Sequence, residues 1–135
     1  MIPRLKHPDR KNAQSILDAA ERQMAYTLTL TPTDESAFNV IRNIYECFRM
    51  LGDALLIARG IESTDHITPI TELLRLKIET ARSICLIDNL RRMRHNVNYY
   101  GYAPKKAEAE DAISFAKACF EPLLKTVTNK IKLRD

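Results

Sequence analysis

The densest group of chemically active side chains in the chain lies at residues 90–102. These thirteen residues include three arginines, one histidine, two asparagines and three tyrosines, with Gly101 near the end. Guanidinium groups donate forked hydrogen bonds to phosphate, imidazole exchanges protons near neutral pH, and aromatic rings stack on nucleic-acid bases. The composition of this segment therefore indicates phosphate binding, base stacking or proton transfer.

Helical spacing divides this segment into two sides. The apolar side chains form one stripe that should face a core, namely Leu90, Met93 and Val97. The polar side chains on roughly the opposite side are Arg91, Arg94, His95 and Asn98. Arg91 and His95 are neighbours on the helix surface, whereas Tyr99 lies about 140° round the helix from Arg94.

All candidate site residues come from this segment. The candidate catalytic residues are Arg94, His95 and Tyr99. The candidate residues for binding RNA or a nucleotide are Arg91, Arg92, Arg94, Asn98, Tyr100 and Tyr102. The alternative interpretation is a solvated helix face, because the helix dipole favours arginines near a C-terminal end.

A second charged group lies at Glu46, Arg49 and Asp53, in a segment that is otherwise apolar. The spacings of three and four residues allow ion pairs along one helix, which is typical of an exposed charged face. The functional interpretation is that one of these acids orients Arg94 or His95 across the bundle. The sequence leaves both interpretations open.

No pattern in the chain predicts a metal or cofactor site. His7, His66 and His95 lack the spacing of metal ligands, and there is no HExxH or CxxC motif. A glycine-rich phosphate loop and a GxSxG motif are also missing from the sequence. We therefore expect any enzymatic activity to be independent of metals and cofactors.

Composition indicates one packed helical domain that spans residues 1–135. Hydrophobic residues make up 45% of the chain and it has only three glycines. A net charge of +4 permits an acidic partner such as RNA without requiring one. We expect a cytoplasmic protein without membrane association, because no apolar run has the length of a membrane span and the N-terminus does not resemble a signal peptide. The three cysteines, Cys47, Cys85 and Cys119, are expected to be small buried side chains in a reducing compartment.

The periodicity of apolar residues predicts two long helices in the first half of the chain. The first should begin near Pro8 and Asp9 and end before the alternating residues 27–31, which we interpret as a fraying helix end and a turn. The second should begin at residues 31–34, with Pro32 as its first helical residue, and end at Gly60. No sheet is expected, because the only alternating run has no second strand to pair with.

In the second half, residues 68–69 are a start signal for a shorter helix, and Gly101 ends the segment that carries the arginines. Between residues 76 and 83 the sequence is compatible with one long helix or with two. A last helix extends from about Ala107 to Ile131, followed by basic residues that suit a helix C-terminus. The predicted fold is all-α, an up-and-down bundle of four long helices with the option of one short extra helix.

Residues 94–95 also carry a resemblance to a known family, the HEPN superfamily (higher eukaryotes and prokaryotes nucleotide-binding). Its motif is an arginine, a directly following polar residue, and a histidine after four to six intervening residues. Arg94 and His95 match the first two positions, and Tyr99 stands where the histidine is expected. The flanking residues 90–91 and 100–101, the segment 55–60 and the pair 65–66 also resemble those of small prokaryotic members. The resemblance extends over about residues 10–130.

This resemblance implies a homodimer that binds RNA or a nucleotide and acts beside a small nucleotidyltransferase, in a toxin–antitoxin or defence-type pair. Arg94 would bind phosphate, but a tyrosine hydroxyl at position 99 is a poor base at neutral pH. We therefore expect weak or no nuclease activity. The alternatives are an active metal-independent ribonuclease toxin that uses Arg94 with His95 or Tyr99, and a protein-interaction module without a nucleic-acid role.

Overall fold

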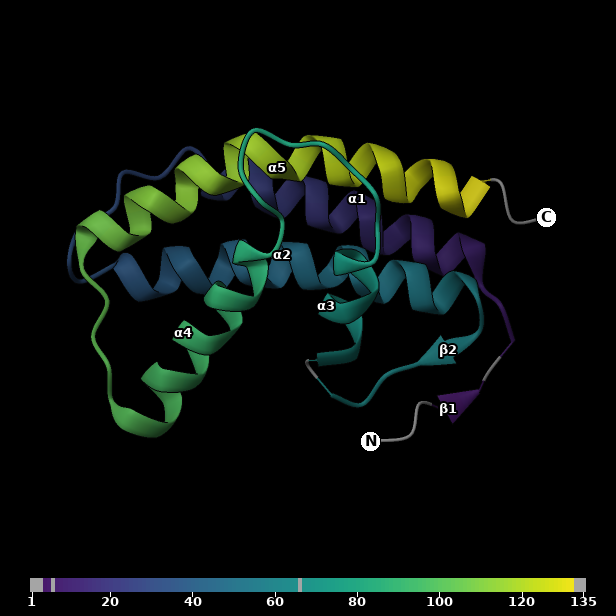
Figure 1. Ribbon diagram of the computed structural model, residues 1–135, viewed down its shortest axis with the longest axis horizontal. Helices are drawn as coiled ribbons and strands as arrows, with labels where there is room; N and C mark the ends of the chain where they lie inside the picture. Colours follow the sequence, from purple (N-terminus) through teal and green to yellow (C-terminus); the bar gives the residue numbers. More distant parts are fainter. Residues whose placement is uncertain (1–3, 6, 66, 133–135) are drawn as a thin grey trace.

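The computed structural model of the protein describes residues 4–5, 7–65 and 67–132, and this part of the chain is almost wholly helical. Five helices and two very short strands follow one another along the chain (Figure 1). Their bounds are β1 Arg4–Leu5, α1 Arg10–Thr27, α2 Ala37–Ala58, β2 Ile61–Glu62, α3 Ile67–Leu74, α4 Leu86–Tyr100 and α5 Lys106–Lys132. The predicted all-α class is confirmed. No helix in the described ranges is both long enough and apolar enough to cross a membrane.

Helix α2 lies at the centre of the fold, and each of the other four helices packs against it. Its buried residues occur along the whole helix and on most of its circumference, as expected for a broad apolar stripe. In Figure 1, α1, α2 and α5 follow the long axis of the molecule, whereas α4 is tilted away from them. The expected up-and-down arrangement of four long helices is therefore not confirmed.

Aromatic contacts between α2 and α5 form the middle of the core. The ring of Phe48 lies 5.3 Å from that of Phe115 and 5.5 Å from that of Phe120, measured between centroids. All three side chains are almost completely buried. Such tilted and edge-on pairs are favoured by the ring quadrupole in addition to the burial of apolar area.

Helix α2 begins at Ala37, so the prediction that it begins at Pro32 is wrong. Thr33 and Ser36 instead bond to each other, through Thr33 N–H to Ser36 Oγ at 2.9 Å and Ser36 N–H to Thr33 Oγ1 at 3.1 Å. Hydroxyl side chains can hold the backbone in a turn in this way and compete with helix formation. The carboxylate of Asp34 accepts a hydrogen bond of 2.7 Å from the backbone N–H of Lys106, so it caps α5 rather than α2.

Glycines end α2 and α4 as predicted. Gly60 has φ of 80° and Gly101 has φ of 66°, a backbone conformation in which a side chain is strained. Helix α1 ends at Thr27 and is followed by a turn, as expected. The open question between residues 76 and 83 is resolved as two helices, α3 and α4, joined by an irregular segment.

Two smaller predictions are wrong. A sheet does exist, because Arg4–Leu5 pairs in antiparallel fashion with Ile61–Glu62, but each strand is too short to show alternation in the sequence. Cys85 is exposed directly before α4, whereas Cys47 and Cys119 are buried as expected. Burial raises the pKa of the Cys47 thiol to about 12, so it remains protonated and unreactive at neutral pH.

Gly52 allows α3 to lie close against α2. A Cβ atom at position 52 would overlap the backbone carbonyl of Pro69. A larger side chain at this position would therefore push α3 away from α2.

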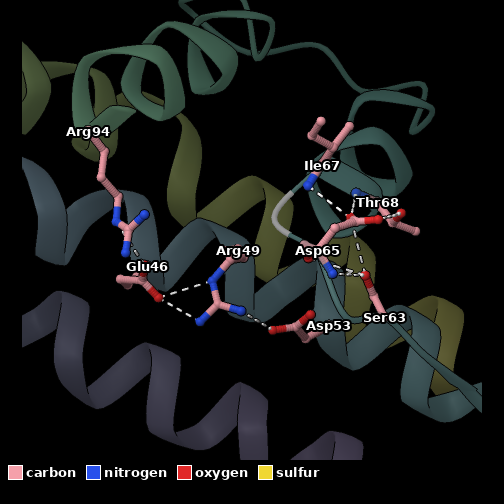
Figure 2. A network of polar contacts seen from close by, with 8 residues as sticks. All are labelled: Glu46, Arg49, Asp53, Ser63, Asp65, Ile67, Thr68 and Arg94. Carbon is pink, nitrogen blue, oxygen red and sulfur yellow. Dashed lines mark hydrogen bonds and ion pairs between the residues drawn. The ribbon is translucent and has the colours of Figure 1, made fainter. Parts of the chain in front are cut away.

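The carboxylate of Asp65 holds the start of α3 (Figure 2). Its Oδ1 accepts hydrogen bonds from the backbone N–H groups of Thr68 at 2.7 Å and Ile67 at 3.0 Å. The bond from Thr68 is the main cause of a pKa below the ordinary value of 3.8 for the Asp65 carboxyl. His66, expected with Asp65 at this helix start, lies outside the described residues.

We predict that Phe48→Ala lowers the free energy of unfolding by about 3–5 kcal/mol, because it removes a buried ring and leaves a cavity. Urea denaturation followed by circular dichroism measures the change. Tyr26→Ala is the matched control, since this ring is 61% exposed and its removal should cost less than about 1 kcal/mol. A loss below about 1 kcal/mol for Phe48→Ala would contradict the central position of this ring.

We also predict that Asp65→Ala lowers the free energy of unfolding by about 1 kcal/mol at pH 7, through the loss of the α3 cap. Because the folded-state pKa is lowered, this contribution is present above the ordinary pKa of 3.8 and is lost as the pH falls through the lowered value. The difference between wild type and Asp65→Ala should therefore shrink below pH 3.8. Asp65→Asn keeps a capping oxygen and should lose less at pH 7. An equal loss in both variants at all pH values would exclude a role of the charge.

Candidate nucleic-acid interface

Helix α4 carries the arginine-rich segment, and only its first half is anchored in the core. Its buried residues are Ile87 and Leu90, while Met93 and Val97, which were expected to face the core, are only half-buried. The helix ends at Gly101, where the N–H of Tyr102 bonds to the carbonyl of Asn96 at 3.3 Å. The second half of α4 therefore extends beyond the core and exposes more than one of its sides.

Arg94 points from α4 toward α2, not toward solvent (Figure 2). Its Nε lies 3.7 Å from Glu46 Oε1, and its side chain is only 29% exposed. Arg91 is also half-buried and bonds through Nε to Asp88 at 2.8 Å. The predicted placement of Arg91 and Arg94 opposite the core is thus wrong. Position 94 lies only about 40° from Leu90 round the helix, which places it at the edge of the buried stripe.

The charged group on α2 forms the ion pairs that its spacing predicts. Arg49 bonds to Glu46 at 2.6 Å and to Asp53 at 2.9 Å. All three side chains are half-buried, so they do not form the exposed face of the simpler interpretation. Burial raises the pKa of the Asp53 carboxyl, although the charge of Arg49 opposes this. The expected contact across the bundle is present for Arg94, through Glu46.

Tyr45, next to Glu46 on α2, belongs to the same region and was not identified from the sequence. Its side chain is 0% exposed, and its hydroxyl has no hydrogen-bond partner. Burial raises its pKa above 10.0, and the charges of Arg49, Arg94 and Arg91 act in the opposite direction. The only sequence signal was its spacing of four residues from Arg49, which is hidden because Tyr45 also fits the apolar stripe.

Three rings form an exposed aromatic platform on the outer side of α4, consisting of His95, Tyr99 and Tyr100. The ring of Tyr99 lies 4.5 Å from that of His95 at an angle of 34°, and the ring of Tyr100 lies 6.0 Å from His95 at 66°. Tyr99 is 72% exposed and Tyr100 is 77% exposed. The side chain of Arg92 is 68% exposed and shares this side of the helix, where it contacts Asp88 at 3.0 Å.

Tyr102 does not join this platform. Its hydroxyl donates to the carboxylate of Glu108 at 2.7 Å, and this bond is the main cause of a raised Tyr102 pKa. The two side chains border a shallow depression of about 300 Å³, which is also lined by Asn89, Arg92, Met93 and Asn96.

The three candidate catalytic residues are therefore divided between two sides of α4. Arg94 faces α2, whereas His95 and Tyr99 stack on each other in solvent. Asn98 is exposed near the end of α4. No group of three His, Cys, Asp or Glu side chains within the described ranges could hold a metal ion. The site offers one side suited to stacking and another suited to ion pairing.

Comparison with known proteins does not assign the chain to a family. No family model matches it, and neither the curated proteins nor the solved structures include a significant match.

Proposed function

We propose that the protein is a HEPN-like, RNA- or nucleotide-binding protein with weak or no nuclease activity. The observation that carries this proposal is the aromatic platform, His95, Tyr99 and Tyr100, beside the exposed guanidinium of Arg92. Large aromatic side chains are seldom left so exposed without a binding role. Single-stranded nucleic acids are bound by this combination, in which bases stack on rings and a basic group meets the backbone.

Two features support weak or no cleavage. Metal-independent cleavage of RNA needs a base for the ribose 2′-hydroxyl and a cation for the charge that develops on phosphorus. Arg94, the proposed cation, lies on the α2 side of the helix, while Tyr99 lies on the outer side. Neither group is placed beside the other within one subunit.

The proposed assembly is a homodimer in which the exposed halves of two α4 helices face each other. Met93, Val97 and Tyr100 are half-buried or exposed in the single chain and would be covered by a second copy. The proposal includes the finer architecture, an up-and-down arrangement of the four long helices α1, α2, α4 and α5. It also includes a small nucleotidyltransferase as protein partner in a toxin–antitoxin or defence-type pair, for which the support is the resemblance of residues 94–95 and their flanks.

We predict that Tyr99→Ala and Tyr100→Ala each weaken binding of a short single-stranded RNA by about 1–3 kcal/mol through lost stacking. Arg92→Ala should reduce the dependence of binding on salt by about one phosphate contact. Fluorescence anisotropy at several salt concentrations measures both effects. Tyr26→Ala, which removes an exposed ring on α1, is the matched control and should leave affinity unchanged. Equal affinity of all variants would contradict the proposal and favour the protein-interaction alternative.

The same RNA, incubated with pure protein in EDTA, tests cleavage. We expect little cleavage by wild type and more by Tyr99→His, because an imidazole titrates near neutral pH and serves as a base. Brisk cleavage by wild type that persists in Tyr99→Phe and is lost in His95→Ala would instead support the ribonuclease alternative.

We further predict a dimer at micromolar concentration in sedimentation experiments, strengthened by phosphate or RNA. Basic side chains on two neighbouring α4 helices repel each other unless an anion lies between them. Val97→Arg should weaken the dimer, whereas the matched change Tyr26→Arg on α1 should not. A monomeric wild type both with and without phosphate would contradict this assembly.

A further inference from the structure

The junction of α2 and α4 contains two buried hydrogen-bond donors that lack an acceptor. One is the hydroxyl of Tyr45, whose side chain is 0% exposed, and the other is Nε of Arg94. The nearest printed contact of Arg94 Nε, Glu46 Oε1 at 3.7 Å, is beyond hydrogen-bond reach. Native proteins rarely leave such groups unpaired, since each costs about 1–3 kcal/mol.

The chemistry of the neighbouring side chains shows which kind of group would complete the junction. Guanidinium groups only donate hydrogen bonds, so Arg49 and Arg91 cannot serve either orphan as an acceptor. Oε2 of Glu46 accepts two bonds from Arg49, at 2.6 and 3.0 Å. The Tyr45 hydroxyl is neutral at physiological pH because burial raises its pKa, so it retains a proton to donate. An acceptor is required.

The local charge favours an acceptor that is negative. Three guanidinium groups, those of Arg49, Arg91 and Arg94, act on the Tyr45 hydroxyl against the single carboxylate of Glu46. In a half-buried region such an excess of positive charge attracts an anion much more strongly than at an open surface. The planar forks of arginine match the oxygen atoms of a phosphate group.

We infer that the α2–α4 junction is an oxyanion site that binds one phosphate group, with the hydroxyl of Tyr45 and Nε of Arg94 as its donors. Arg49 is a positioning residue, since its pairing with Glu46 and Asp53 fixes the charged lining on α2. Binding requires the second half of α4 to move away from α2. Beyond Leu90 this half contributes no buried residue to the described core, so the movement disrupts little packing.

This inference deepens the proposed function, because the phosphate would belong to the RNA or nucleotide whose base stacks on the aromatic platform. The two surfaces lie on different sides of the same helix, and Arg94 directly precedes His95 in the chain. The anion site can nevertheless be tested with inorganic phosphate alone, without any nucleic acid.

The experiment is a titration of wild type with inorganic phosphate at constant ionic strength, followed by isothermal calorimetry. We expect saturable binding of one phosphate per chain. Tyr45→Phe and Arg94→Gln should each weaken it roughly tenfold or more, as loss of a hydrogen bond to a charged group predicts. Tyr26→Phe on α1 and Arg75→Gln on α3 are matched controls that should bind as wild type. No saturable binding, or unchanged affinity in Tyr45→Phe and Arg94→Gln, overturns the inference.

The stability of Tyr45→Phe without phosphate provides a second measurement. Removal of an unpaired buried hydroxyl should leave the melting temperature unchanged or raised, because no partner is left unsatisfied. Phosphate should then raise the melting temperature of wild type more than that of Tyr45→Phe. A variant that melts lower than wild type in the absence of phosphate would show that the hydroxyl is bonded within the protein, and would overturn the inference.

Adenosine monophosphate and adenosine distinguish the sources of the phosphate and separate the two proposals. Tighter binding of the monophosphate than of inorganic phosphate, reduced to equality by Tyr99→Ala, supports a nucleotide ligand. Equal binding of both in wild type supports a site for free phosphate. If phosphate binds through Tyr45 and Arg94 but RNA does not bind, the anion site stands and the proposed function falls. If RNA binds through Tyr99 and phosphate alone never does, the reverse holds.

Discussion

Burial of α2 on most of its circumference is the constraint on which the rest of the structure depends. Each of the other helices covers part of α2, and the rings of Phe48, Phe115 and Phe120 join it to α5. A helix so nearly enclosed can carry charge only where its covering is thin. Glu46, Arg49 and Asp53 occupy that position and remain half-buried. Their mutual pairing is what makes charged side chains tolerable there, because an unpaired buried charge would be strongly destabilising.

The partial attachment of α4 follows from the same constraint. Ile87 and Leu90 fill the space that remains on α2, and the rest of the helix has no further apolar surface to cover. One helix therefore presents two chemically different sides. The side toward α2 has guanidinium groups in a half-buried, charged environment, and the outer side has exposed rings that stack on one another. A nucleotide has the complementary division, with a charged phosphate at one end and a flat base at the other.

The sequence predicts much of this fold because its main elements depend on local patterns. The helical period of the apolar residues, Gly60 and Gly101 as helix ends, and the spacing of Glu46, Arg49 and Asp53 all act over a few residues. The errors arise where a distant element decides the outcome. The signals at residues 31–34 are satisfied by each other and by α5, and β2 pairs with a strand at the other end of the chain segment.

The candidate site was harder to predict for the same reason. Arg94 was assigned to the polar side of α4, since only the position of α2 shows that this arginine lies at the edge of the buried stripe. Tyr45 has the size and polarity of an ordinary core residue in the sequence. Its unpaired hydroxyl becomes visible only when the neighbouring arginines of two helices are placed round it.

The hydrogen bond between Asp34 and Lys106 has a consequence for the order of folding. It joins residues 72 positions apart, so it can form only after the intervening helices have docked. The first turn of α5 then acquires its cap late, whereas α1 carries its own cap in the adjacent Asp9. The folding of α1 and α2 is therefore a local event, and the closure of the end of the molecule that holds α4 is a topological one. The region that we associate with ligand binding belongs to the part of the chain that is completed last.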